Sequence, residues 1–174
     1  LVSSGIWEGE VVDAQKMKMN EKDPPKAKVN NEFGGEISER IGPAIVMRRD
    51  LMLCDHYEDG KPIPFCMMLK PGETNIIDFG QNCAGVPHIQ ASAERGTKLT
   101  IKLAEMLNDG IKGHHGDGPK GSVYMANMRG ASSTLEYTCS GEKRQDVMME
   151  RYHPLTTFYG YRYAAVSADK PLLF

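Results

Sequence analysis

The stretch of sequence that decides the fold is VPHIQASAERGTKLTIKLA, residues 86–104. Residues 98–104 alternate between apolar and polar side chains, so an extended chain would be apolar on one side and polar on the other. Residues 86–93 alternate in the same way, and the turn-forming residues 94–97 separate the two runs. We therefore predict two β-strands joined as a hairpin.

Strand signals continue on both sides of this stretch. Short apolar or β-branched runs, separated by Gly, Pro and Asn, recur at intervals of roughly ten residues, which is typical of a sandwich or barrel. The expected strands are residues 44–53, 65–69, 74–79, 134–139, 147–152, 156–158 and 161–167. No run of a dozen residues has helical periodicity. The pattern predicts an all-β chain that folds as an antiparallel, jelly-roll-like β-sandwich.

The composition is that of a globular domain with little net charge. Hydrophobic residues make up 40% of the 174-residue chain, and 21 Lys and Arg nearly balance 23 Asp and Glu. So small an imbalance creates no long-range field, which argues against nucleic acid and anionic membranes as partners. No apolar run reaches the ~20 residues needed to cross a bilayer. The four cysteines lack zinc-site spacing, so we expect mostly buried free thiols, with a disulfide as the alternative in an exported protein.

The N-terminal quarter of the chain differs from the rest. Residues 7–14 resemble the end of a strand, whereas residues 16–36 are rich in Lys, Pro, Asn and Gly and predict a linker or surface loop. The compact domain is expected to begin near Pro43. Because the chain opens with Leu1 rather than Met and stops in an apolar run at residues 172–174, we also expect both ends to be cut from a longer protein.

A long loop is predicted at residues 108–121, which are rich in Gly, Asp and His. Its oxygen-bearing side chains Asn108, Asp109 and Asp117 are candidate ligands for calcium, which prefers carboxylate and amide oxygens. The two adjacent histidines of the loop would point opposite ways on an extended chain, which argues against a shared transition metal. We therefore expect either no cofactor or calcium.

Aromatic residues cluster near the C-terminus. Alternation would place Tyr159, Tyr161 and Tyr163 on one face of a strand, with Phe158 and Arg162 on the other. Two interpretations stay open for this cluster. The rings either form part of the core with their hydroxyls near the surface, or they form a platform on which a sugar ring stacks.

Residues 75–85, NIIDFGQNCAG, resemble the DFGQN-x-AG signature of the concanavalin-like β-sandwich domain of bacterial α-L-rhamnosidases. Three further blocks, at residues 96–107, 127–138 and 151–163, resemble later motifs of that family in the family's order. Upstream, residues 9–14, GEVVDA, are similar to the end of the N-terminal domain that precedes this sandwich in the family.

The resemblance implies two segments, residues 1–42 as the end of the preceding N-terminal domain plus a linker and residues 43–174 as the β-sandwich. It also implies a parent enzyme that removes terminal α-L-rhamnose with inversion, using acidic residues on an α/α barrel. The acidic residues of this chain are scattered, and no spacing selects a pair that could flank a glycosidic bond. We therefore expect no catalytic residue here, and an accessory domain whose partner is the catalytic barrel.

An alternative from the binding class is a carbohydrate-binding module for rhamnose-containing glycans, with or without calcium. Its candidate contacts are Asp78, Gln81 and Asn82 of the signature and the rings of Tyr159 and Tyr161. In an accessory domain, by contrast, the carboxylate and amides of the signature would bind backbone groups at a sharp strand end.

Overall fold

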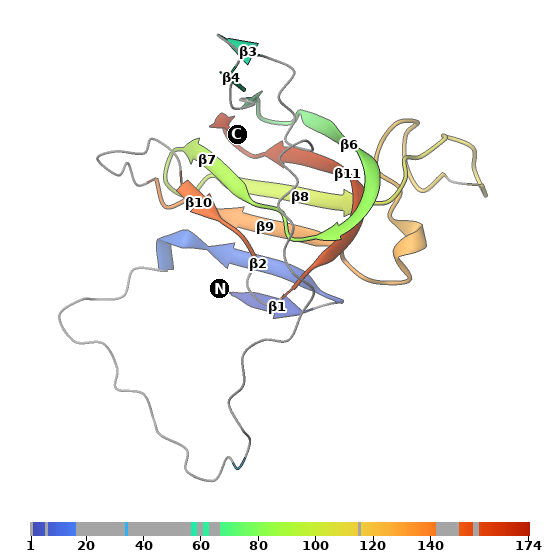
Figure 1. Cartoon of the computed structure of the whole chain (residues 1–174), viewed down its shortest axis with the longest axis horizontal. Coiled ribbons are helices and arrows are strands. Elements are labelled where there is room, and N and C mark those ends of the chain that lie inside the picture. The colour runs from blue at the N-terminus through green and yellow to red at the C-terminus, as the bar shows by residue number, and fades with distance from the viewer. Residues whose placement is uncertain are drawn as a thin grey trace, which may run out of the picture.

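Figure 1 shows the computed structural model, in which strands make up nearly all of the regular secondary structure of the described residues. The structure describes residues 2–5, 7–16, 34, 57–58, 61–62, 67–114, 116–141, 150–154 and 157–174. The strand expected at residues 44–53 lies outside this part of the chain. The described residues confirm the all-β prediction, since their helical segments are two short 3-10 turns, η1 (Ala14–Lys16) and η3 (Ala126–Met128).

Two sheets form an antiparallel β-sandwich, as predicted. The larger sheet has the strand order β1-β2-β9-β8-β11-β6, and the smaller has the order β10-β7-β12-β5. The larger sheet consists of β1 (Ser3–Gly5), β2 (Gly9–Asp13), β9 (Thr134–Thr138), β8 (Lys98–Ala104), β11 (Tyr159–Ala168) and β6 (Thr74–Gly85). The smaller consists of β10 (Glu150–Tyr152), β7 (Ile89–Ala93), β12 (Leu172–Leu173) and β5 (Met68–Leu69). A separate pair joins β3 (Tyr57–Glu58) to β4 (Lys61–Pro62).

The core lies between the two sheets. Leu99, Ile101 and Leu103 form the apolar side of β8, and each is at most 2% exposed. From the smaller sheet, Leu69 of β5 and Ile89 of β7 belong to the same buried cluster. Full burial of one such side chain contributes about 1.5–3 kcal/mol, so this layer is the main source of stability. The alternation in β8 is thereby confirmed.

The predicted hairpin between the two central strands is wrong. β7 belongs to the smaller sheet and β8 to the larger, so the turn at residues 94–97 carries the chain from one sheet to the other. β7 pairs with β10 and β12, whereas β8 pairs with β9 and β11. Alternation shows that each strand has one apolar side. It does not determine whether two such strands lie side by side or face each other across a core.

The N-terminal segment forms part of the larger sheet. β1 pairs with β2, and β2 pairs in parallel with β9, the one parallel pairing among the described strands. Residues that the sequence assigned to the end of a preceding domain therefore contribute two strands to the sandwich. The boundary near residue 43 stays a prediction, because residues 35–56 lie outside the described residues.

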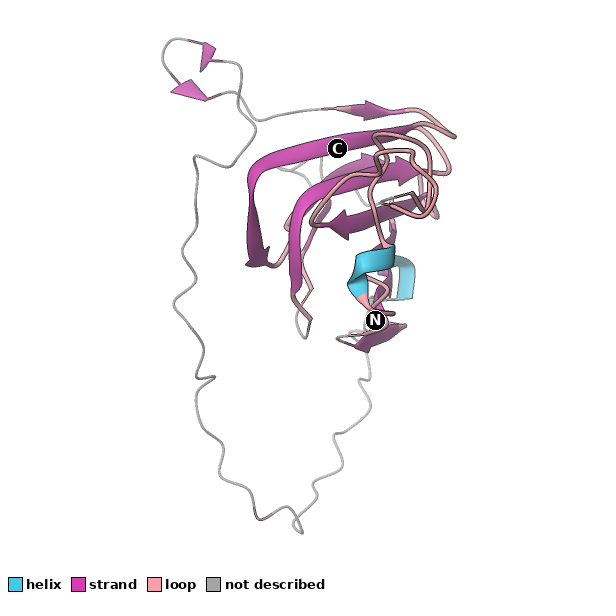
Figure 2. Cartoon of the chain, turned by 90° about the vertical axis from the view of Figure 1, so that its right-hand side faces the viewer, coloured by secondary structure: helices cyan, strands magenta, loops and turns pink. Residues whose placement is uncertain are grey.

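A large β-bulge interrupts the pairing of β6 with β11. Cys83 lies opposite Tyr161 and Asp78 lies opposite Tyr163, so four residues of β6 face the single residue Arg162 of β11. Bulges bend the strand that carries the extra residues. β6 curves strongly along its length in Figure 1, and the long strands are also curved in the side view of Figure 2.

The bulge also changes which side of the sheet the tyrosines occupy. Tyr159 and Tyr161 belong to the core cluster between the sheets, whereas Tyr163 packs against Ala104 and Ala165 on the opposite face. We call this opposite face, which points away from the smaller sheet, the outer face. The expectation that the three tyrosines share one face is therefore wrong, because it assumed unbroken alternation through Arg162.

Candidate functional site

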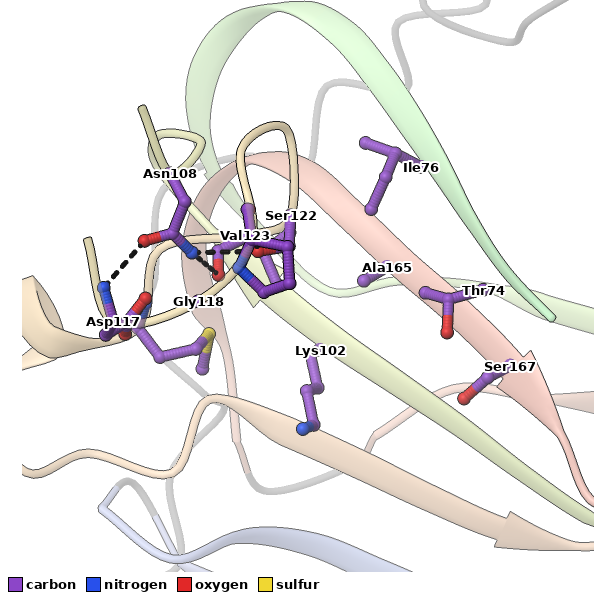
Figure 3. Close-up of a pocket in the computed structure, with 12 residues that line it drawn as sticks. Thr74, Ile76, Lys102, Asn108, Asp117, Gly118, Ser122, Val123, Ala165 and Ser167 are labelled. Carbon is purple, nitrogen blue, oxygen red and sulfur yellow. Dashed lines mark hydrogen bonds between the residues drawn. The ribbon is translucent and has the colours of Figure 1, made fainter. Parts of the chain in front are cut away.

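A groove of about 580 Å³ lies on the outer face of the larger sheet. Figure 3 shows it between the sheet and the long loop that joins β8 to β9. The sheet side of the groove is formed by Thr74, Ile76, Lys102, Ala165 and Ser167. These side chains offer hydroxyls, one amine and an apolar floor, a combination that can hold a small polar molecule by hydrogen bonds and packing.

Asn108 organises the loop side of the groove and is only 3% exposed. Its amide nitrogen donates to the Ser122 hydroxyl and to the Val123 carbonyl, both at 2.9 Å, and its amide oxygen accepts the Asp117 backbone N–H at 2.9 Å. The same three bonds appear as dashed lines in Figure 3. Because both ends of the Asn108 side chain are engaged within the loop, its role is to hold the loop together.

Asp117 lines the same groove, but its carboxylate also binds backbone groups. Oδ2 accepts the N–H groups of Met125 and Ala126, each at 2.9 Å, at the start of η3. Partial desolvation opposes ionisation, yet hydrogen bonds from Asn108 and from these two N–H groups outweigh it, so the pKa of Asp117 is lower than usual. The residue is therefore a charged cap for the turn.

Asp109 is not among the residues that line the groove. Its Oδ1 accepts the Ile111 N–H at 2.8 Å, and its Oδ2 contacts His114 Nδ1. The structure thus brings Asn108 and Asp117 together but engages Asp109 with the tip of the loop. Within the described residues, no three acidic, His or Cys side chains are grouped so as to hold a metal. Calcium binding by these three residues stays a prediction.

The second candidate site is the bulge, which contains the signature residues. Asp78 receives a two-point hydrogen bond from Arg162, with Nε to Oδ1 at 2.8 Å and the second nitrogen to Oδ2 at 2.9 Å. Its Oδ1 also accepts the Gly80 backbone N–H at 2.8 Å. The Arg162 hydrogen bond is the main reason that the pKa of Asp78 is lowered. The predicted bond from this carboxylate to the backbone is confirmed.

The other two signature residues of the candidate sugar site are also exposed at the bulge. Asn82 donates its side-chain amide to Glu105 Oε1 at 3.3 Å, a side-chain contact where a backbone contact was expected. No side-chain hydrogen bond joins Gln81 to another described residue. Sugar binding by these side chains stays a prediction.

The two candidate stacking rings are buried. Tyr159 is 5% exposed and Tyr161 is 6% exposed, and the Phe79 and Tyr161 rings form a T-shaped pair with 5.3 Å between ring centres. Burial raises the pKa of each hydroxyl to about 12, with a further contribution from Glu10 for Tyr159 and from Cys83 for Tyr161. Burial favours the core interpretation of both rings, because a stacking platform must expose a ring face.

Sequence reasoning missed two residues that tie distant segments together. Glu10 is 1% exposed and accepts hydrogen bonds from Ser4 Oγ, at 3.0 Å, and from the Tyr152 hydroxyl of the other sheet. Arg162 joins the two long strands at the bulge. The apolar residues that follow Glu10, Val11 and Val12, could have predicted that Glu10 is buried. No residue near Arg162 in the sequence indicated that its partner is Asp78.

Two of the four cysteines lie among the described residues, and both are free thiols. Cys139 is buried, and burial together with nearby carboxylates raises its pKa to about 12. Cys83 is partly buried and contacts the Tyr161 carbonyl at 3.3 Å. In the part of the chain that the structure describes, no helix is long and apolar enough to cross a lipid bilayer.

Comparison with known proteins identifies the family. Residues 69–171 match the family model of the bacterial alpha-L-rhamnosidase concanavalin-like domain. An alpha-L-rhamnosidase of Streptomyces avermitilis is 36% identical over 98 residues, which cover 56% of this chain and 8% of the relative. One from Alteromonas sp. (strain LOR) is 32% identical over 139 residues, which cover 79% of this chain and 13% of the relative. The solved alpha-L-rhamnosidase structure from Dictyoglumus thermophilum has a TM-score of 0.55 at 21% identity, and the match covers 97% of this chain and 18% of that one.

The fold and these matches show that the chain is a concanavalin-like β-sandwich domain. It belongs to the bacterial α-L-rhamnosidase concanavalin-like domain family, as the motif resemblance indicated. The chain spans 8% and 13% of the lengths of the two curated relatives, so it corresponds to a small part of each.

Proposed function

We propose that this chain is a non-catalytic accessory domain that packs against an α/α-barrel catalytic domain. The parent enzyme would hydrolyse terminal α-L-rhamnosides with inversion. The domain's own contribution is structural, because it supplies a rigid sandwich against which the barrel is held. Both curated relatives are named alpha-L-rhamnosidase, which supports this activity for the protein that contains this chain.

The observation that carries this proposal is the network at the bulge. Two polar residues of the signature bind partners on strands that are far apart in sequence, Asp78 with Arg162 and Asn82 with Glu105. A hydrolytic site requires carboxylates that are free to face a substrate, whereas Asp78 is engaged by a guanidinium and a backbone N–H. The network therefore favours a role in shaping the sandwich.

The first test measures hydrolysis and sugar binding by the purified chain. With an aryl α-L-rhamnoside, we expect no release of the aryl group above the buffer blank. In an NMR titration with L-rhamnose, we expect no saturable shift of the Asp78 to Asn82 amide signals. Saturable release of the aryl group by homogeneous protein would overturn the proposal.

The second test addresses packing. In the Streptomyces avermitilis relative, deletion of the segment matched by this chain should lower the thermal midpoint and the rate of hydrolysis. Replacing that segment with the matching 98 residues of this chain should restore both. A deletion that leaves midpoint and rate unchanged would contradict the packing role.

A second candidate function is carbohydrate binding in the outer-face groove, and the observation that favours it is the lining by the Thr74 and Ser167 hydroxyls and the Lys102 amine. Calcium would act there only if Asp117 exchanged its backbone bonds for a metal. The test is a titration with L-rhamnose, with and without a chelator, that follows the amide signals of the groove. Asp117→Ala should abolish any calcium-dependent binding, whereas Asp169→Ala, at an exposed site outside this groove, should not.

A further inference from the structure

Strand pairing and hydrogen bonds join the described part of the N-terminal segment, residues 2–5 and 7–16, to residues 95–152 of the sandwich. Residues 10–13 pair in parallel with residues 135–138 of β9. Ser132 donates its N–H to the Trp7 carbonyl at 2.6 Å, and Arg95 donates to Gln15 Oε1 at 3.0 Å. The connection from this segment to the next described strand, β3, runs through residues 17–56, so long a link that closure itself imposes little geometry. The contacts must therefore define how the segment docks.

Glu10 gives this docking its chemical specificity. The carboxyl lies between the two sheets, where it meets the Ser4 hydroxyl of β1 and the Tyr152 hydroxyl of β10. Tyr152 in turn stacks on Tyr137 of β9, with 5.3 Å between ring centres. A carboxyl buried to 1% exposure must keep such partners, so this position selects an acidic side chain over an apolar one.

Gly9 gives the docking its steric specificity. Its φ is +76°, and a Cβ atom at this position would lie 2.2 Å from the Thr134 carbonyl oxygen. That oxygen belongs to the backbone of β9, so moving it would disturb the pairing of the strand. Pairing with this edge of β9 therefore requires glycine at position 9, directly before Glu10.

We propose that the edge of β9 that β2 covers, together with Tyr152, is a strand-acceptor site for an extended peptide. The site takes a peptide that runs parallel to β9 and carries glycine, then a carboxylic acid, then a β-branched apolar residue two positions later. In this chain the site is filled by Gly9, Glu10 and Val12, the last of which is 1% exposed. The covalent link through residues 17–56 is not needed to hold the segment in place.

The test begins with the full chain, in which a site-specific protease sequence replaces residues 20–26. After cleavage, size-exclusion chromatography at micromolar concentration should elute residues 1–19 together with the sandwich. Separation of the peptide from a sandwich that keeps its circular dichroism spectrum would overturn the proposal.

Specificity is tested by competition, which leaves the sandwich itself unaltered. A labelled peptide of residues 1–16 is first exchanged into the cleaved protein and then displaced by unlabelled variants. We expect the Glu10→Gln peptide to compete at least about tenfold more weakly than the natural sequence, because Gln offers only one acceptor oxygen to the Ser4 and Tyr152 hydroxyls. Glu8→Gln, at an exposed position two residues away, should compete as well as the natural sequence. Equal competition by the two variants would refute a Glu10-specific site.

A second pair of variants separates steric exclusion from glycine flexibility. A Gly9→Ala peptide should fail to compete, because its methyl group would collide with the Thr134 carbonyl. The same substitution is also made in the full chain that carries the protease sequence. There Gly72→Ala is the control for backbone conformation, since Gly72 has a φ of +79° but open space around it. Chains with Gly72→Ala should retain the cleaved segment, whereas chains with Gly9→Ala should release it on cleavage. Retention by both would contradict the required glycine.

Discussion

In the first half of β11, Tyr159 and Tyr161 point into the core, whereas in the second half Tyr163 packs on the outer face of the same sheet. The two halves are separated by Arg162, where four residues of β6 face one residue of β11. Each half alternates regularly, but the two alternations are out of step. A single change of register thus decides which side chains of a strand belong to the core and which can meet a ligand or a neighbouring domain.

The largest expected effect comes from removing a ring on each side of the bulge. Tyr161→Ala should lower the free energy of unfolding by about 3–5 kcal/mol, because it leaves a cavity between the sheets. Tyr163→Ala, which removes a partly exposed ring, should cost about 1 kcal/mol. Guanidinium unfolding measures both values. Equal losses would show that the two residues are not divided between core and surface.

The alkaline titration of the buried tyrosines gives the next largest effect. The pKa values of Tyr159 and Tyr161 are raised from 10.0 to about 12, so their neutral forms stabilise the fold. This stabilisation is complete below pH 10 and is lost as the pH rises through about 12. Absorbance at 295 nm should show a step near pH 12, and Tyr161→Phe should reduce that step. The same step should move to about pH 10 in 6 M guanidinium.

A smaller effect is expected at the apex of the bulge. Gly80 has a φ of +78° and open space around its Cβ position, so a side chain there meets backbone strain but no collision. Gly80→Ala should therefore destabilise the fold by about 1 kcal/mol, and Gly80→Asn by less, because Asn tolerates the left-handed conformation. Thermal unfolding of the two variants tests this order. If Gly80→Asn destabilises the fold more than Gly80→Ala, the glycine is not needed to avoid backbone strain.

The smallest effect concerns the exposed ion pair beside the bulge. Because the pKa of Asp78 is lowered from 3.8, ionised Asp78 stabilises the fold above that pH, and the contribution is lost as the pH falls through the folded-state value. Asp78→Asn should flatten the acid limb of the plot of thermal midpoint against pH and change the midpoint little in 1 M salt, where exposed pairs are screened. An acid limb identical to that of the unsubstituted chain would show that another group controls it.

The sequence predicted well those features that depend on local alternation. The apolar side of β8 and the sandwich class follow from the spacing of Leu99, Ile101 and Leu103 and from turns at regular intervals. The role of Asp78 in binding a nearby N–H also follows from local chemistry, because Asp before Gly commonly closes such a turn.

Features that depend on long-range register could not be predicted. Nothing near Arg162 shows that its partner lies 84 residues earlier, and nothing near Tyr163 shows that the bulge reverses its side. Glu10 looks like one of many acidic residues until β2 is placed beside β9 and Tyr152 reaches it from the other sheet. Pairing between distant strands is decided by the whole fold, which local propensities do not encode.

The closed neck of the loop between β8 and β9 has a practical consequence for engineering. The backbone N–H of Asn108 donates to the Ser122 carbonyl at 2.7 Å, while its side chain binds Val123, so both ends of the excursion are fastened at its base. The tip near Gly113, where a Cβ atom would have open space around it, therefore contributes little to the stability of the sandwich. Foreign peptides spliced at that tip should be displayed without disturbing the scaffold, much as epitopes are presented on a rigid carrier.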